Sequence, residues 1–173
     1  MKKTFLLLII LFLVIGYYSC ERDDICPGSA STTPSLIIDV FDFNSQENKK
    51  NIFGLLIAGV GRQDILPGYG IVSSNRLVLP LNTKDSETQY SLIKDAVLNE
   101  DGTLLSGNED VITINYSVTP IFVSKACGYK YIFENVTIQL DETDTDPWIL
   151  SRASINPNQS VEDETTTHFN IFH

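Results

Sequence analysis

A cysteine at the end of an apolar segment is the residue of this chain whose surroundings most clearly indicate chemistry. Cys20 follows two lysines, an apolar block over Phe5–Tyr18 that one glycine interrupts, and the small residue Ser19. A basic n-region, an apolar h-region and a small residue directly before a cysteine are typical of a lipoprotein signal peptide. We therefore predict that residues 1–19 are removed and that the thiol of Cys20 is acylated.

Two other interpretations of this segment stay open, namely plain secretion and an uncleaved anchor. The apolar block spans 14 residues, whereas a helix that crosses a bilayer needs about 20, which disfavours a permanent transmembrane anchor. Tyr17 and Tyr18 precede Ser19, so the A-x-A-like pattern of ordinary secretory cleavage is absent. Lipidation at Cys20 is the preferred interpretation.

The chain has three cysteines, and an odd count in an exported protein needs an explanation, which acylation of Cys20 supplies. The other two, Cys26 and Cys127, are an even pair in a compartment where disulfides persist. A bridge between them would close a loop of about 100 residues, worth about 4–5 kcal/mol in the chain-entropy model. The alternatives are two free thiols or a metal site, although no histidine lies near either cysteine in the sequence. We predict a Cys26–Cys127 disulfide.

Histidine, which often serves in acid–base catalysis, occurs only at His168 and His173. Phe169 and Ile171 are expected on one face of the last strand, which places His168 on the opposite, wetter face as a surface or edge residue. His173 is interpreted simply as the last residue of the sequence. The sequence therefore predicts no catalytic residue.

The densest acidic run is Asp141–Asp146, and it contains two aspartates in the alternating spacing that calcium loops use. The run lacks the glycine and the distal glutamate of an EF-hand, so a solvated turn is the preferred interpretation. The same holds for Glu162–Glu164. We predict no metal ligand and no cofactor.

Glycines and aromatic residues offer two further motifs. Gly59-Val60-Gly61 is followed at the sixth position by Asp64, so the dinucleotide-binding fingerprint fails. The glycines of this region, which also include Gly54, are expected to allow bulges and tight turns. A sugar-stacking platform could form from three aromatic residues, for which core packing is the commoner role: Tyr69, Tyr90 and Trp148.

The elements that must position these residues are expected to be strands. Apolar side chains alternate with polar ones over Val111–Val118, the period of two expected of a half-buried strand. The apolar phase of residues 129–140 shifts after Phe133, which predicts a β-bulge near Glu134–Asn135. Other expected strands are Leu36–Phe43, Ile52–Val60 and residues 76–81, with weaker candidates at Gln89–Lys94, Trp148–Ile155 and Thr166–Phe172.

Turn-rich segments separate these strands, and an Asp-Gly hairpin signal lies at residues 100–103. No segment shows a sustained helical period. The pattern predicts an all-β fold of a single domain over residues 35–173, an antiparallel β-sandwich of immunoglobulin-like type with seven or eight strands. Residues 20–34 are predicted to be a lipidated flexible tether.

Charge restricts the partners of the protein. Loss of residues 1–19 from the 173 leaves 154 residues with 10 basic and 22 acidic side chains, a formal charge of −12. Such a surface repels phosphate backbones, so nucleic acid is not an expected partner. It would also be repelled by anionic lipid headgroups, so we expect the lipid on Cys20, and not the domain, to contact the membrane.

One motif resembles a known family. Ala126-Cys127-Gly128-Tyr129-Lys130 is similar to the hallmark of a family of Bacteroidota, mainly flavobacterial, lipoproteins known only as a domain of unknown function. Matching pieces occur in the same order at Asp24-Ile25-Cys26, Thr33-Pro34, Pro80-Leu81-Asn82, Trp148-Ile149 and Thr167-His168. The resemblance implies an exported lipoprotein with Cys26 paired to Cys127, and it implies no activity.

Glu21-Arg22-Asp23-Asp24 resembles the signal that sends many Bacteroidota lipoproteins to the outer leaflet, so the protein is expected in the cell envelope, on the periplasmic face or the cell surface. The sequence predicts a non-catalytic binding or structural module at the outer membrane, with a protein or a glycan as partner left open. The alternatives are a carbohydrate-active or other hydrolytic enzyme that uses paired carboxylates, and a ligand-binding accessory lipoprotein of a transporter.

Overall fold

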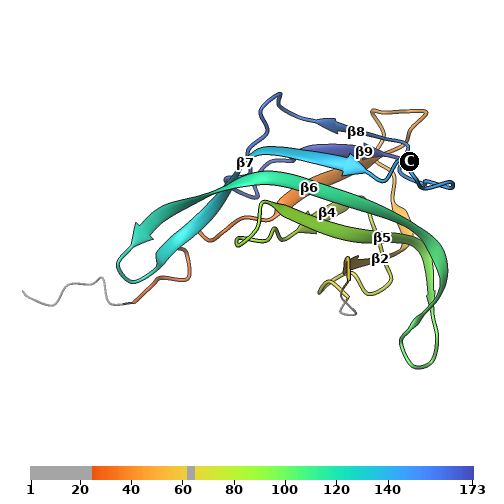
Figure 1. Cartoon of the computed structure of the whole chain (residues 1–173), viewed down its shortest axis with the longest axis horizontal. Coiled ribbons are helices and arrows are strands. Elements are labelled where there is room, and N and C mark those ends of the chain that lie inside the picture. Colours follow the sequence, from red (N-terminus) through yellow and green to blue (C-terminus); the bar gives the residue numbers. More distant parts are fainter. Residues whose placement is uncertain (1–24, 62–64) are drawn as a thin grey trace, which may run out of the picture. The chain divides into compact units, whose positions relative to one another are not determined.

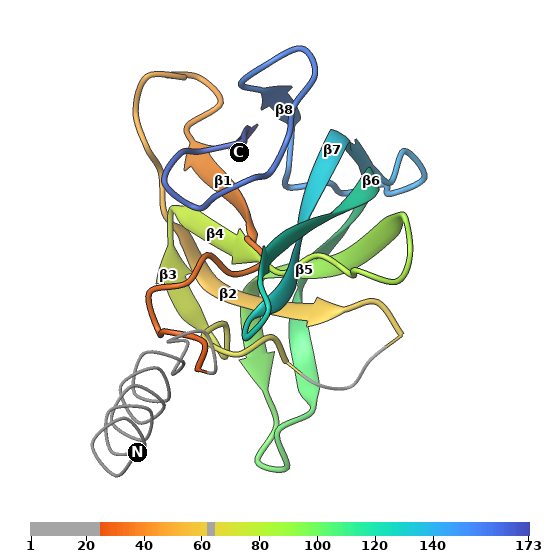
Figure 2. The same cartoon turned by 90° about the vertical axis from the view of Figure 1, so that its left-hand side faces the viewer.

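A computed structural model describes residues 25–61 and 65–173 of the chain, and within them the regular structure is entirely β. The nine strands, each labelled in Figure 1 or Figure 2, are β1 (Leu36–Phe41), β2 (Ile52–Gly59), β3 (Val72–Ser74), β4 (Arg76–Leu79), β5 (Glu87–Leu98), β6 (Leu104–Ser124), β7 (Gly128–Leu140), β8 (Ser151–Ser154) and β9 (Phe169–Phe172).

The strands form two sheets, of four and five strands. The four-stranded sheet has the order β4-β1-β9-β8, and the five-stranded sheet has the order β3-β2-β5-β6-β7. β6 and β7 lie side by side in both views of the ribbon (Figures 1 and 2). The expected all-β class is therefore confirmed, and the described residues form nine strands where seven or eight were predicted.

The four-stranded sheet is not purely antiparallel, which corrects the prediction. β1 pairs antiparallel with β4, but it pairs parallel with β9, with Ile38 opposite Phe169 and Val40 opposite Ile171. β8 then returns antiparallel to β9. The first and last described strands of the chain are thus neighbours in one sheet.

Both sheets contribute to one buried apolar cluster. Leu36, Ile38 and Val40 of β1 lie in it, because alternate residues of a strand face the same side. Every strand from β1 to β9 except β3 and β8 supplies fully buried or nearly buried side chains to this cluster, which includes Leu79, Ile57, Leu92, Ile112, Phe133, Val136 and Ile171.

The predicted bulge in β7 is confirmed. Phe133 and Val136 are both buried, and the two residues between them, Glu134 and Asn135, are exposed. Asn135 has a φ of 53°, in the left-handed region that asparagine tolerates better than most residues. Because of the extra residue, the apolar side chains before and after the bulge, which fall on odd and even positions respectively, point to the same side of the sheet and face the core.

A second irregularity joins β2 to β5. Gly54 has a φ of 58°, and a Cβ atom added there would lie 2.9 Å from the Cα atom of Asp95, which itself has a φ of 52°. The register of β5 on β6 shifts between Lys94 and Val97. Glycine at position 54 therefore permits a close approach of two backbones at this bulge.

The Asp-Gly hairpin is confirmed between β5 and β6. The N–H of Asn99 donates to the carbonyl oxygen of Thr103 at 2.8 Å, and Gly102 adopts a φ of 84°. β6 continues far beyond the predicted Val111–Val118, since it begins at Leu104 and ends at Ser124.

Candidate functional site

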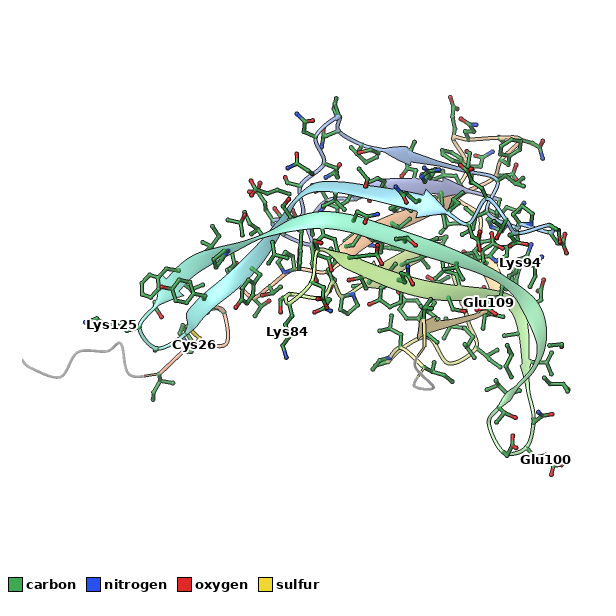
Figure 3. All side chains as sticks on the ribbon, in the orientation of Figure 1. Cys26, Lys84, Lys94, Glu100, Glu109 and Lys125 are labelled. Carbon is green, nitrogen blue, oxygen red and sulfur yellow. A yellow bond between two sulfur atoms is a disulfide. The ribbon has the colours of Figure 1, made fainter. Side chains whose placement is uncertain are left out.

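The described chain divides into two compact units, and one of them contains both cysteines of the predicted pair. Residues 25–32 and 121–130 form this smaller unit, which we call the hairpin tip; the larger unit comprises Thr33–Pro120 and Tyr131–His173. The strand ends of β6 and β7 in the hairpin tip are joined by the three residues 125–127. Figure 3 shows Lys125 at this turn and Cys26 close to it.

A disulfide joins Cys26 to Cys127 in the hairpin tip, with 4.8 Å between the two Cα atoms. The N–H of Cys127 donates to Ser124 Oγ at 3.0 Å, and Gly128, with a φ of 71°, lets the chain turn into β7. The pair that the sequence predicts is thus the pair that the structure contains. Cys20, with its predicted lipidation, and the predicted signal peptide over residues 1–19 lie outside the described residues.

The segment that the disulfide holds in the hairpin tip was predicted to be part of a flexible tether over residues 20–34. Residues 20–24 lie outside the described residues. Within the described part, the N–H of Ala30 donates to the carbonyl oxygen of Pro27 at 2.9 Å, and Lys130 Nζ donates to Ser31 Oγ at 2.8 Å. This part of the segment therefore has defined contacts within the hairpin tip.

The hairpin tip exposes apolar side chains. Phe122 and Tyr129 face each other edge to face, with 5.4 Å between their ring centroids, and are 57% and 63% exposed. Ile25 and Ile121 of the same unit are also exposed. The sequence analysis missed this surface, although the signal was present: apolar residues continue past Val118 up to the turn that holds Cys127.

The larger unit has a cavity of about 510 Å³, which is lined by residues 59–60, 65–67, 80–82 and 87–90. Its hydroxyl groups bond to the protein itself: Tyr90 Oη donates to the carbonyl oxygen of Pro80, and Thr88 Oγ1 lies 2.5 Å from Tyr116 Oη. Glu87 is the carboxylate in its lining. These polar groups hold neighbouring segments together and do not converge on the cavity.

A second cavity of about 530 Å³ lies on the outer side of β2 and β5 and is lined by apolar side chains that include Leu56 and Ile93, with two carboxylates at its margin. Ser91 Oγ donates to Glu109 Oε1 at 2.5 Å. The N–H and hydroxyl of Thr103 both donate to Asp101 Oδ1, which lowers the pKa of Asp101. A general acid needs a raised pKa, so Asp101 does not suit that role.

Asp110 is a carboxyl group with a raised pKa, and burial is the main cause of the shift. It is next to Glu109 in β6 but on the opposite, inner face. Its two oxygens accept hydrogen bonds from the backbone N–H groups of Trp148 at 3.1 Å and Ile149 at 2.7 Å. Asp110 therefore fixes the chain after the acidic run to the sheet, and it lines neither cavity.

His168 is buried, which contradicts the prediction of a surface or edge residue. Its ring Nδ1 accepts a hydrogen bond from the main-chain N–H of Ile37 at 2.9 Å, and the main-chain N–H of His168 donates to the carbonyl oxygen of Ile37 at 3.0 Å. Burial lowers the pKa of His168. The prediction was wrong because alternation along β9 does not reveal that β1 covers the residue before that strand.

His173 is buried as well, and it is more than the last residue of the sequence. Its ring packs edge to face on Trp148 with 5.7 Å between centroids, and its main-chain oxygen accepts a hydrogen bond from Lys50 Nζ at 2.9 Å. Burial lowers its pKa too. Both histidines contribute to packing on the four-stranded side of the core.

The acidic runs form local turns. The N–H and the hydroxyl of Thr143 donate to Asp141 Oδ1, which lowers the pKa of Asp141, and the N–H of Asp146 donates to Asp144 Oδ1 at 2.9 Å. The N–H of Thr165 donates to Asp163 in the same way. Among residues 25–61 and 65–173, no three histidine, cysteine or acidic side chains form a group that could hold a metal ion.

The predicted alternative of a sugar-stacking platform is not supported by the positions of its aromatic residues. Tyr69, Tyr90 and Trp148 are each buried in the main core cluster. Trp148 Nε1 donates to the carbonyl oxygen of Leu92 at 3.2 Å, which fixes the indole inside the protein. Core packing, the commoner role, is what the structure gives them.

Comparisons with known proteins identify a family but no activity. A family model described as a family of unknown function, DUF6452, matches residues 54–173. No curated protein and no solved structure matches the chain. In the part of the chain that the structure describes, no helix has the length and apolar character needed to cross a bilayer.

Proposed function

We propose that this chain, which belongs to the DUF6452 family of unknown function, is an exported lipoprotein of the Bacteroidota type, anchored through Cys20 and acting as a non-catalytic binding or structural module at the outer membrane. One observation carries the proposal. The disulfide uses Cys26 and Cys127, so Cys20 is the cysteine that remains of the three in the sequence, and it follows the apolar segment and Ser19.

The same pair of cysteines supports the proposed compartment. Disulfides persist in oxidising compartments such as the periplasm and the cell surface, and they are rare in the cytosol. A disulfide that begins six residues after Cys20 therefore agrees with export of the chain past the inner membrane. Three acyl chains, the usual complement of a bacterial lipoprotein cysteine, would make the attachment permanent, since two lipid signals already suffice for stable anchoring.

The non-catalytic role is supported by how the carboxylates are used. Paired carboxylates in a glycosidase include one with a raised pKa that faces the substrate. Asp110 has the raised pKa but is buried against backbone N–H groups, and Asp101, at the margin of the second cavity, has a lowered one. The hydrolase alternative gains no support from this arrangement.

For the fold, we propose the immunoglobulin-like sandwich, with the four-stranded and five-stranded sheets as its two layers. Support comes from the single apolar cluster to which both sheets contribute, since two sheets that share an interior are the usual arrangement of such sandwiches.

Acylation can be tested by growing producing cells with a clickable palmitate analogue. We expect label on the wild-type protein and on the Cys26→Ser/Cys127→Ser variant, and no label on Cys20→Ser. The double variant is the matched control, because it removes two thiols and keeps the third. Label that persists in Cys20→Ser, or a wild-type protein without label, would contradict the proposal.

The membrane and its leaflet need a separate measurement. Density-gradient fractionation should place the wild-type protein with the outer membrane and Cys20→Ser in the soluble fraction. Protease added to intact cells then distinguishes the two faces: digestion indicates the cell surface and protection indicates the periplasmic face. Recovery of wild-type protein in the cytosol would contradict export.

A further inference from the structure

The hairpin tip combines exposed apolar side chains with a local charge that differs from that of the whole chain. Among the described residues, its two segments hold four of the large apolar side chains that are exposed: Ile25, Ile121, Phe122 and Tyr129. The same segments, residues 25–32 and 121–130, contain two lysines and no aspartate or glutamate. The formal charge of −10 therefore comes from other parts of the chain.

We propose that the hairpin tip inserts Phe122, Tyr129 and their apolar neighbours into the interfacial region of the lipid bilayer to which Cys20 is attached. The proposal rests on the proposed lipidation of Cys20. It revises the expectation that the lipid alone contacts the membrane, an expectation that treated the acidic charge as evenly distributed.

The disulfide sets how far the hairpin tip can lie from the anchor. Cys26 is six positions after Cys20, and a chain spans at most about 3.3–3.6 Å per residue, so Cys26 stays within about 20 Å of the acylated cysteine. Cys127 is bonded to Cys26, with 4.8 Å between the Cα atoms. The turn between β6 and β7 is thereby held near the bilayer surface even though it lies about 100 residues further along the chain.

The side chains match the chemistry of that surface. Tyrosine is enriched at membrane interfaces, where its ring lies among apolar groups and its hydroxyl reaches water. Tyr129 is 63% exposed and stacks edge to face on Phe122, so the two rings present one apolar unit. Lys125 is exposed at the turn, and a lysine stem can lie along apolar surface with its ammonium group in water.

Apolar insertion, and not attraction to anionic headgroups, is expected to dominate. Glu21, Asp23 and Asp24 lie in the sequence between the anchor and the hairpin tip, and they offset the two lysines. A small apolar contact is weak in isolation, but a short tether makes it intramolecular at an effective concentration in the millimolar range. We therefore expect insertion by the anchored protein and little binding to vesicles by the unlipidated chain.

The test uses the lipidated mature protein in vesicles of phosphatidylethanolamine and phosphatidylglycerol, with and without brominated acyl chains. Tyr129→Trp places a fluorescent reporter in the hairpin tip. Phe53→Trp is the matched control, because Phe53 of β2 is also 63% exposed but belongs to the larger unit. Trp148 gives a constant buried background, so each variant is compared with the unmodified chain, whose spectrum also checks the fold.

We expect the added emission of Tyr129→Trp to shift to shorter wavelength and to be quenched by brominated chains, and that of Phe53→Trp to do neither. Unquenched emission from both variants would overturn the proposal, as would quenching of both, which would mean contact by the larger unit. A shift of Tyr129→Trp without quenching would indicate a second copy or another protein on the hairpin tip and would also overturn it.

Failure of the anchor can be distinguished from failure of the insertion. Vesicle flotation and the mass of the Cys20 peptide report the anchor separately from the fluorescence. A chain that is not acylated and does not float would refute the proposed function and remove the basis of this proposal. A chain that is acylated and floats, with the tryptophan at position 129 unquenched, would refute the insertion alone.

Discussion

His168 and Ile37 are joined by a reciprocal pair of hydrogen bonds. The N–H of Ile37 donates to His168 Nδ1 at 2.9 Å, and the N–H of His168 donates to the carbonyl oxygen of Ile37 at 3.0 Å. Both residues are buried, and 131 positions separate them in the sequence. The side chain of His168 thus supplies an acceptor that the parallel pairing of β1 and β9 does not provide.

Replacement of His168 by phenylalanine should lower the free energy of unfolding by about 1–3 kcal/mol, because the buried N–H of Ile37 would lose its acceptor. Urea denaturation followed by circular dichroism measures this loss. His173→Phe is the matched control, since it replaces a second buried histidine whose ring packs on Trp148 without a side-chain hydrogen bond among the described residues. An equal loss in both variants would contradict the role assigned to Nδ1.

Stability should fall as the pH is lowered through the ordinary histidine range. Burial lowers the pKa of both His168 and His173 in the folded state, so the unfolded chain binds more protons below about 6.5. Their contribution to stability is complete above about pH 6.5 and is lost towards lower pH. Asp110 has the opposite effect, because burial raises its pKa above the usual 3.8 in the folded state. Its contribution to stability is present at lower pH and is lost as the pH rises through that raised pKa.

Comparison of variants isolates the histidine contribution to this pH dependence. Urea midpoints of the wild type and of His168→Phe should converge as the pH falls from about 7.5 to about 5, because only the wild type has this histidine to protonate. The contribution of Asp110 is common to both proteins and cancels in the difference. A gap between the midpoints that stays constant with pH would contradict the assignment.

Loss of the disulfide should destabilise the protein. Cys26 and Cys127 are 101 positions apart, and the chain-entropy model values a loop of that size at about 4–5 kcal/mol. We expect Cys26→Ser, Cys127→Ser and the double variant to lose similar amounts, because removal of either thiol opens the same loop. Denaturation with and without reductant measures the effect, and a wild-type midpoint that reductant leaves unchanged would be the contrary result.

Gly54→Ala should cost about 2 kcal/mol or more. A left-handed backbone costs a residue with a Cβ atom about 1–2 kcal/mol, and here the new methyl group would also lie 2.9 Å from the Cα atom of Asp95. Gly70→Ala is the matched control, since nothing lies within 4 Å of a Cβ atom there and its φ is not positive. Thermal unfolding of the two variants should differ clearly, and similar midpoints would argue against the close approach.

Asp110→Ala should destabilise the protein by about 1.5–3 kcal/mol for each charge-assisted hydrogen bond it loses, with partial relief from the removal of a buried carboxylate. The N–H groups of Trp148 and Ile149 would then lose their acceptor. Glu142→Ala, in the acidic run and exposed, should change stability by less than about 0.5 kcal/mol. Chemical denaturation of both variants, with Trp148 fluorescence as the readout, provides the comparison.

Local features of the fold could be predicted from the sequence because they depend on neighbours along the chain. The order of apolar and turn-forming residues along the chain predicts the β-bulge in β7 and the turn at Gly102, and both are present in the structure. The Cys26–Cys127 pair could be predicted because few cysteines left few combinations.

Features that depend on distant segments could not be predicted. Parallel pairing of β1 with β9 brings together segments that carry no signal of each other, and burial of His168 depends on that pairing. The aromatic pair of Phe122 and Tyr129 was overlooked for a different reason: the two residues are close in the sequence, but each fits an ordinary strand, and the pairing of β6 with β7 across the turn brings the two rings together.

Because β1 pairs with β9, the four-stranded sheet joins the first described strand to the last. A chain that emerges N-terminus first, from a ribosome or a translocation channel, cannot complete this sheet until residue 172 is available. Contacts of such long sequence separation form late and slowly. The topology thus lets the five-stranded sheet, whose strands all precede β8 in the sequence, pair before the four-stranded sheet can be completed.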